Sequence, residues 1–430
     1  MLLINNEIKE SINKTAITYD IKANNLFYNS LAKVNKRKKE YSFDDEDNKN
    51  EKDNNHINVH HNISPSFKNH KSALYRYINK DIPKDVDSLD EMPVESEYYK
   101  TIDNENYLAY KSDNMLIFMS KFQAQLLYKY NAHVFLDGTF YTAPNAAYQI
   151  VTVRIHDILT DNFYTVAYGI LKDKTTGSYI EFLDNVKNYV YINRENKRNL
   201  EYNNPINIHS DFELSIINAI KQVYPSSEIK LCLWHFFRNI EINRNKIYGS
   251  IDNQTQESKN ILKRIKTICF MDPNYIEDIF EYIEEDAKDD IKDQNFVKYF
   301  KTTYIEKYNI KYWNYFKIFD HRTNNACESY NHILNSKFNS KPSIWKFISV
   351  IRGEEELLRL EINRVREGEI EGGKKKKGII SFEKQCLKYY DNIDNDIKKI
   401  KNSNSENKED LILNIWYNAL LDFPIYDYNA

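Results

Sequence analysis

Two different spacings of hydrophobic residues divide the central part of the chain into predicted strands and helices. Short apolar runs rich in β-branched and aromatic residues predict strands, whereas apolar residues recurring every three or four positions predict helices. The strands fall at 133–137, 148–153, 163–168, 205–211 and 229–235, and the helices at 178–190 and 214–223. The order is three strands, a helix, a strand, a helix and a strand, which predicts an α/β fold. Ser178 is the expected N-cap of the first helix.

The rest of the chain after this region has helical periodicity. Residues 236–320 are predicted to be mostly helical, because pairs such as Ile279-Phe280 and Ile283 recur between charged faces. A polar turn at 321–325 leads into another helix, from Ala326 to about Lys337. The C-terminal region, 366–430, is predicted to be helical as well, with interruptions at its glycines.

The N-terminal region differs in composition. Residues 1–72 are predicted to form a disordered Asn/Lys/Asp-rich tail, since they contain few apolar residues to offset chain entropy. Residues 73–130 are predicted to form a mostly helical lead-in to the α/β region. No apolar run long enough to cross a membrane and no charged-then-apolar leader is present in the sequence, so a soluble intracellular protein without a membrane partner is expected.

Charge and cysteine content narrow the function classes. The 430 residues include 60 Lys and Arg against 63 Asp and Glu, for a formal charge of −3, so a nucleic-acid surface can only be a local patch. The four cysteines are far apart, which excludes a disulfide framework and favours a reducing compartment.

Three carboxylates are placed where they can do chemistry. Asp137 and Asp211 each end an apolar run, and Glu328 lies near the start of a predicted helix. A carboxylate at the end of a buried strand is costly unless a cation meets it, and an all-oxygen cage suits Mg²⁺ or Mn²⁺. Gly138, directly after Asp137, leaves room for a phosphate backbone to approach.

The same residues also have simpler structural interpretations. A strand-terminal aspartate is commonly a turn residue, and Asp211 could cap the helix that follows it. Glu328 lies three residues after Asn325, which also fits a capping box. On spacing alone, both interpretations remain open.

Taken together, several ordered motifs resemble those of Mutator-like element (MULE) transposases. The resemblance covers roughly 75–365, including a hairpin-like stretch at 148–171. The motifs are Leu136-Asp137-Gly138-Thr139-Phe140, Ser210-Asp211-Phe212-Glu213, Leu231-Cys232-Leu233-Trp234-His235-Phe236, Thr323-Asn324-Asn325-Ala326-Cys327-Glu328-Ser329 and Pro342-Ser343-Ile344-Trp345-Lys346-Phe347.

The resemblance implies a fold and a division of the chain. It implies a ribonuclease-H-like mixed sheet flanked by helices, whose first part is 131–235. Residues 236–320 would be an all-α insertion before the final catalytic glutamate. Residues 321–365 would complete the core with the glutamate helix, leaving 366–430 as the C-terminal helical region.

The resemblance also implies an activity. Asp137, Asp211 and Glu328 would form the catalytic Asp-Asp-Glu (DDE) set and hold two Mg²⁺ or Mn²⁺ ions. The enzyme would cleave DNA at transposon ends and transfer the strand to target DNA. The implied partners are the terminal inverted repeats and target DNA, bound by a homo-oligomer in the nucleus.

Cys232 and His235 match a Cys-x2-His motif that the resemblance implies has a supporting role. From the residues alone, half of a zinc site or a packed strand end are the alternatives, and no zinc is predicted. The chain has no cysteine before Cys232, so it lacks the N-terminal Cys/His finger of many relatives, and it also lacks a C-terminal Cys/His knuckle. A domesticated or truncated transposase that binds DNA without cleavage is therefore the alternative function. The basic runs Lys36–Lys39 and Lys374–Lys377 are either nuclear-import or phosphate-contact clusters, or solvated loops.

Overall fold

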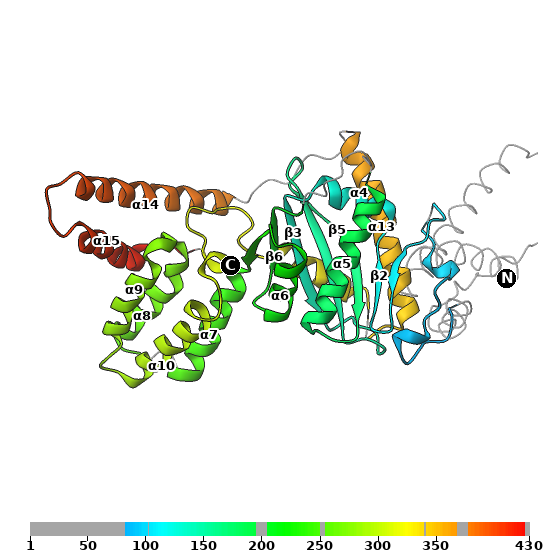
Figure 1. Ribbon diagram of the computed structural model, residues 1–430, viewed down its shortest axis with the longest axis horizontal. Helices are drawn as coiled ribbons and strands as arrows, with labels where there is room; N and C mark the ends of the chain where they lie inside the picture. The colour runs from blue at the N-terminus through cyan, green and yellow to red at the C-terminus, as the bar shows by residue number, and fades with distance from the viewer. Residues whose placement is uncertain are drawn as a thin grey trace, which may run out of the picture.

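A computed structural model describes six stretches of the chain, namely 82–101, 103–194, 204–249, 254–338, 341–367 and 377–425. The predicted tail at 1–72, including Lys36–Lys39, and most of the basic run 374–377 lie outside these residues. The described part has two halves, a helix-flanked sheet and a group of helices, which lie side by side in Figure 1.

A seven-stranded mixed sheet forms the first half, and the predicted α/β class is confirmed. Its strands are β1 (Leu108–Lys111), β2 (Met115–Phe118), β3 (His133–Thr139), β4 (Gln149–Asp157), β5 (Asn162–Leu171), β6 (Asn207–Ser210) and β7 (Glu228–Leu231). They are ordered β1-β2-β5-β4-β3-β6-β7. Across the sheet, each neighbouring pair in the series β1-β2-β5-β4-β3 is antiparallel. Strand β6 runs parallel to both of its neighbours, β3 and β7. The parallel pairing brings the C-terminal ends of β3 and β6 to the same edge.

Helices cover both faces of the sheet, because alternate strand residues point to opposite sides. On one face, Met115 and Val153 pack with α4 (Lys121–Lys129), α5 (Thr176–Asn193) and α6 (Leu214–Val223). On the other face, Phe118 and Ile150 pack with α12 (Asn325–Ser336) and α13 (Ile344–Arg366). Figure 1 shows α5 lying across the sheet. The sheet is thus the middle of three layers.

The lead-in differs from its prediction. The described part of 73–130 contains one α-helix, α4, two single-turn 3₁₀ helices at Leu89–Glu91 and Glu97–Tyr99, and the strands β1 and β2. The expectation of a mostly helical segment is wrong here. The short run Met115–Phe118 is buried at every position, so its pairing with β5 decides its conformation.

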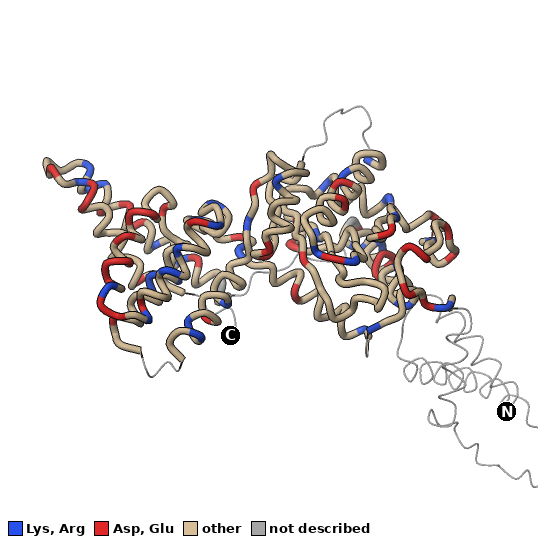
Figure 2. Tube along the Cα trace, turned by 60° about the horizontal axis from the view of Figure 1, so that its bottom comes forward, with Lys and Arg blue, Asp and Glu red and all other residues tan. Residues whose placement is uncertain are grey.

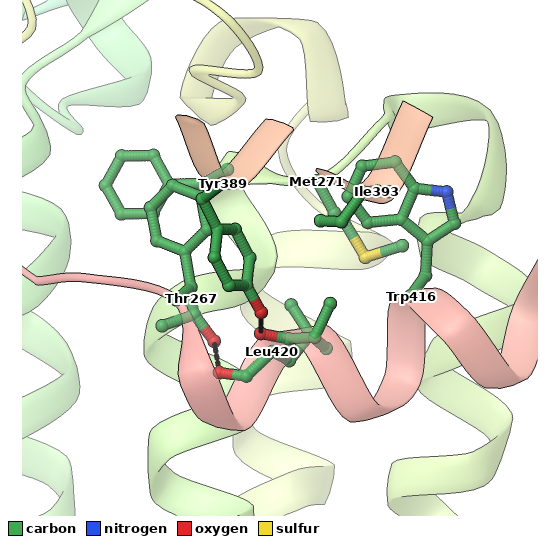
Figure 3. Close-up of a pocket in the computed structure, with 9 residues that line it drawn as sticks. Thr267, Met271, Tyr389, Ile393, Trp416 and Leu420 are labelled. Atoms are coloured by element: carbon green, nitrogen blue, oxygen red, sulfur yellow. Dashed lines mark hydrogen bonds between the residues drawn. The ribbon is translucent and has the colours of Figure 1, made fainter. Parts of the chain in front are cut away.

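The second half is helical, as predicted for 236–320. It contains α7 (Leu233–Tyr248), α8 (Gln256–Thr267), α9 (Ile276–Asp286), α10 (Ile291–Phe300) and α11 (Ile310–Trp313), together with α14 (Lys377–Lys401) and α15 (Lys408–Asp422). Thr267 of α8 donates a 2.7 Å hydrogen bond to the carbonyl of Leu420 in α15, and Tyr389 of α14 donates one of 2.6 Å to that of Ala419 (Figure 3). The surrounding apolar seam is packed too closely to admit water. The C-terminal helices therefore share a core with the preceding helices.

Two local predictions are wrong. The last predicted strand, 229–235, ends at Leu231, and α7 begins at Leu233, so His235 lies on the first turn of a helix. The turn forms because the N–H groups of Cys232 and Leu233 donate to the carbonyls of Ser210 and Arg322. At α5 the N-cap is Thr175, whose side chain accepts the N–H of Ser178.

Candidate active site

The three predicted carboxylates come from three separate elements. Asp137 lies on β3, two residues before the strand ends. Asp211 directly follows β6, the parallel neighbour of β3 (Figure 1). Glu328 is in the first turn of α12, which packs against β3. The sheet register and the helix docking together bring these distant positions toward one edge.

His235 lies between two of these carboxylates. Its Nδ1 is 2.8 Å from Oδ1 of Asp211 and 3.8 Å from Oε1 of Glu328. Burial would lower the pKa of His235, but the contacts with Asp211 and Cys232 oppose it and raise the pKa to about 10. The imidazolium charge therefore offsets part of the repulsion between the two acids.

Asp137 completes the group from the sheet side. Burial raises the pKa of Asp137 to about 8, and the negative charges of Asp211 and Glu328 add to the shift, while His235 opposes it. Burial also raises the pKa of Glu328, again with a contribution from Asp211. These mutual effects show that the three carboxylates share one electrostatic environment.

The simpler structural interpretations of Asp211 and Glu328 do not fit this geometry. The N-cap of α6 is Glu213, so Asp211 does not cap the helix that follows it. The N-cap of α12 is Asn324, and its side chain forms no capping hydrogen bond, so Glu328 is not part of a capping box. Instead, the buried Oε1 of Glu328 has no hydrogen-bond donor, and the buried Oδ1 of Asp211 has only the charged contact with His235. Buried carboxylate oxygens with so few partners fit a site for a cation.

Cys232 and His235 both lie in this group, at the turn between β7 and α7. Donor atoms of Asp211, Cys232 and His235 all lie within 4.8 Å of one another. The Cys232 Sγ also accepts the backbone N–H of Asn324 at 3.2 Å, just before α12. Cys232 therefore connects the β7–α7 turn to the segment that carries Glu328.

Three residues hold α12 in place, and of these only Asn324 belongs to a motif named from the sequence. Asn331 donates to Asp137, and the Asn324 side chain donates to the carbonyl of Leu136. Arg154 of β4 donates to the carbonyl of Ala326 and lies over the ring of Tyr330. Asn331 follows Glu328 by three positions, which places both on one face of a helix. This spacing could have indicated a role for Asn331 near the site. No local sequence pattern indicates one for Arg154.

The comparison with known protein families gives a match, which overlaps part of this site. Residues 133–239 match the MULE transposase domain. The matched segment of the domain includes Asp137, Asp211, Cys232 and His235, but it ends before Glu328. No curated protein matches the sequence.

A MULE transposase domain implies that the chain binds DNA and takes part in its cutting and transposition, and it suggests dependence on a divalent metal. Along the described part of the chain, Lys and Arg are interspersed with Asp and Glu in both halves (Figure 2). Among the described helices, none has the length and hydropathy that a membrane crossing needs.

Proposed function

We propose that this MULE domain belongs to a DNA transposase of the DDE type, which cleaves DNA at transposon ends and transfers the strand to target DNA. One observation carries the proposal: Asp137 on β3, Asp211 just after β6 and Glu328 on α12 share one electrostatic environment with His235, which pairs with Asp211, while the buried Oε1 of Glu328 has no hydrogen-bond donor. A protein that only binds anionic DNA has no need for such a group, because it repels phosphate.

The proposed fold is a ribonuclease-H-like core. The order β5-β4-β3-β6-β7 supports it, with three antiparallel strands followed by two parallel ones. In this interpretation 131–235 and 321–365 form the core and 236–320 is the all-α insertion. In the C-terminal region 366–430, helices α14 and α15 pack against that insertion, as the α8–α15 hydrogen bond supports.

The carboxylates fit two Mg²⁺ or Mn²⁺ ions, because hard cations prefer oxygen ligands and Cys232 Sγ is already an acceptor for Asn324. When bound, the ions supply activation of a water or a 3′-hydroxyl and neutralise charge at the phosphate. Asp137, Asp211 and Glu328 are the proposed ligands. His235 orients Asp211, and Asn331 orients Asp137 through its hydrogen bond. Gly138 is exposed beside Asp137 and presents no side chain to an approaching backbone.

The proposal also covers the DNA partners, the oligomeric assembly and the cellular localisation. The DNA partners are the terminal inverted repeats and the target DNA, held by a homo-oligomer, and the protein acts in the nucleus. A domesticated protein that binds DNA without cleavage is the alternative, and it predicts that the carboxylates are dispensable.

Cleavage of DNA carrying the element's own ends tests the proposal. The full chain is incubated with this DNA in Mg²⁺ or in EDTA, and nicked and cut products are measured. We expect Mg²⁺-dependent cleavage that Asp211→Asn abolishes, while DNA binding in EDTA is retained. Asp184→Asn, an exposed aspartate on α5, is the matched control and should cleave normally. Cleavage that survives Asp211→Asn would remove Asp211 from the mechanism, and binding without any cleavage would favour the alternative.

A further inference from the structure

Exposed aromatic residues are concentrated next to the carboxylate group. Among the exposed large hydrophobic residues of the described chain, four are aromatic, and three of them are Phe140, Tyr141 and Tyr148, with exposures of 46%, 58% and 48%. The fourth, Tyr191, lies on α5. Single exposed apolar residues need no explanation, but a cluster of large rings does. We refer to Phe140, Tyr141 and Tyr148 as the aromatic triplet.

The loop that carries the aromatic triplet is anchored in the core. Ala143 and Ala146 lie between its members in sequence and are buried in the core cluster that also contains residues of α12 and α13. Tyr148 donates its backbone N–H to the carbonyl of Leu171 at 2.8 Å, and its ring meets that of Phe140 edge to face at 5.3 Å. The same anchored loop therefore buries its small side chains and leaves its large rings in solvent. A loop selected only for folding would do the reverse.

The position of the triplet relates it to the candidate active site. Phe140 is three residues beyond Asp137, so their Cα atoms are no more than about 11 Å apart. Since consecutive phosphates of one DNA strand advance by about 3.4 Å along the helix axis, this span corresponds to a few nucleotides.

Basic residues accompany aromatic rings on two sides of the carboxylates. Lys174 lies over the Phe140 ring at 6.0 Å, and its charge also reaches Glu213 beside Asp211. On α7, Arg238 lies over the Trp234 ring at 5.0 Å, and its charge reaches Glu328. A ring for a base next to a cation for a phosphate is the combination that binds single-stranded nucleic acid.

We propose that the aromatic triplet is a stacking site for unpaired bases of the DNA strand next to the phosphodiester at the carboxylates. The inference rests on the proposed function, and it adds the requirement that the DNA is locally unpaired where it is cut. Stacking favours unpaired bases because bases within a duplex already stack on one another. Lys174 supplies the cation for the neighbouring phosphate.

Binding without metal tests this site separately from cleavage. The full chain is titrated in EDTA into a fluorescein-labelled 15-nucleotide oligo-dT and, separately, into the oligo-dT·oligo-dA duplex of the same length. We expect Tyr141→Ala and Tyr148→Ala each to weaken binding of the single strand by roughly 5- to 150-fold and to change duplex binding little. Tyr141→Phe and Tyr148→Phe should bind as the wild type does, because the ring remains. Tyr191→Ala is the matched control and should have no effect.

A second measurement reads the base directly. An oligonucleotide with 2-aminopurine should lose fluorescence when the wild type binds it, and the loss should be smaller with Tyr141→Ala. Equal single-strand affinities of wild type and both Ala variants would overturn the inference. So would a wild-type dimer that the Ala variants lack, since the triplet would then be a protein interface. Because these assays contain no metal, Mg²⁺-dependent cleavage that persists in either case would leave the proposed function standing.

Discussion

The side-chain amide of Asn331 donates a 2.6 Å hydrogen bond to Oδ2 of Asp137, so the helix that carries Glu328 is tied directly to the strand that carries the first aspartate. Both residues are buried. The other oxygen of Asp137 accepts the N–H of Gly138 at 3.0 Å. Donors on both oxygens favour the ionised carboxylate, the form that holds a cation, and so oppose the burial that raises the pKa of Asp137.

Removing the amide of Asn331 should therefore impair catalysis more than folding. In Asn331→Ala, Asp137 loses the donor that fixes its orientation, and loss of such a supporting contact typically costs 10- to 100-fold in metal affinity or activity. Mg²⁺-dependent cleavage should fall by about this factor, and more Mg²⁺ should be needed for half-maximal rate. His332→Ala, on the exposed face of α12, should cleave as the wild type does. An unchanged Mg²⁺ requirement in Asn331→Ala would mean that the contact only stabilises the fold.

Divalent metal should stabilise the protein through the same carboxylates. At Mg²⁺ concentrations about 100-fold above the Kd, linkage predicts a rise in melting temperature on the order of 5 °C. Asp211→Asn should abolish the rise. Without metal, this variant should melt near the wild-type temperature, because the loss of one of three mutually repelling carboxylates and the loss of the Asp211–His235 ion pair oppose each other. Thermal melts with Mg²⁺ and with EDTA measure both effects, and Asp184→Asn should keep the full rise. A wild type that gains nothing from Mg²⁺ would contradict the proposed ligand set.

Much of this arrangement could be predicted from the sequence, because the ends of strands and the starts of helices depend mainly on local residues. The apolar run before Asp137 and the run before Asp211 both form strands, and their parallel pairing brings the two acids to one edge. Glu328 was placed at a helix start, as observed. None of this periodicity encodes how far apart the carboxyl groups lie, since that depends on how α12 docks on the sheet.

The features that were missed depend on tertiary contacts. The strand predicted at 229–235 stops at Leu231 because carbonyls from Ser210 and Arg322, both distant in sequence, accept the N–H groups of the turn. The apolar run at 115–118 is too short to indicate strand or helix, and its partner strand β5 decides it. Arg154 donates to the carbonyl of Ala326 in α12 from strand β4, which is buried at every position. Its charge alone does not indicate a partner 172 residues away.

Four histidines near the other end of the central strands should make the fold sensitive to acid. His133 Nδ1 is 3.0 Å from His209 Nε2, and the His321 ring is 4.3 Å from those of both His133 and His156. Burial lowers the pKa of His321 to about 3, with further lowering by His133 and His156, while Asp320 and Asp161 oppose the shift. Burial also lowers the pKa of His133.

Because the folded pKa of His321 lies below its unfolded value, its contribution to stability is complete above pH 6.5 and is lost as the pH falls toward 3. Each proton taken up on unfolding lowers the free energy of unfolding by at most about 1.4 kcal/mol per pH unit. His321→Asn should reduce the fall in the free energy of unfolding at acid pH, since asparagine does not titrate. Asparagine also tolerates the positive φ of 54° found at this position. Urea unfolding between pH 7.5 and 4.5 measures the slope. Exposed His332→Asn is the control, and equal slopes for wild type and His321→Asn would show that His321 is not the group involved.

Gly169 of β5 should be intolerant of any side chain, because α5 packs directly onto it. A Cβ at this position would lie 2.5 Å from Cε2 of Phe182 and 2.7 Å from Cδ1 of Leu171. Gly169→Ala should destabilise the protein by about 1–3 kcal/mol, the usual cost of overpacking. Combining it with Phe182→Leu should cost less than the sum of the two single changes, with a coupling of roughly 0.5–3 kcal/mol. Gly177→Ala, whose Cβ would meet only Thr175 Oγ1 at 3.9 Å within helix α5, should instead stabilise by up to about 1 kcal/mol. Urea unfolding of the four variants and the wild type measures these differences, and strictly additive effects at 169 and 182 would show that Phe182 does not set the limit on size at Gly169.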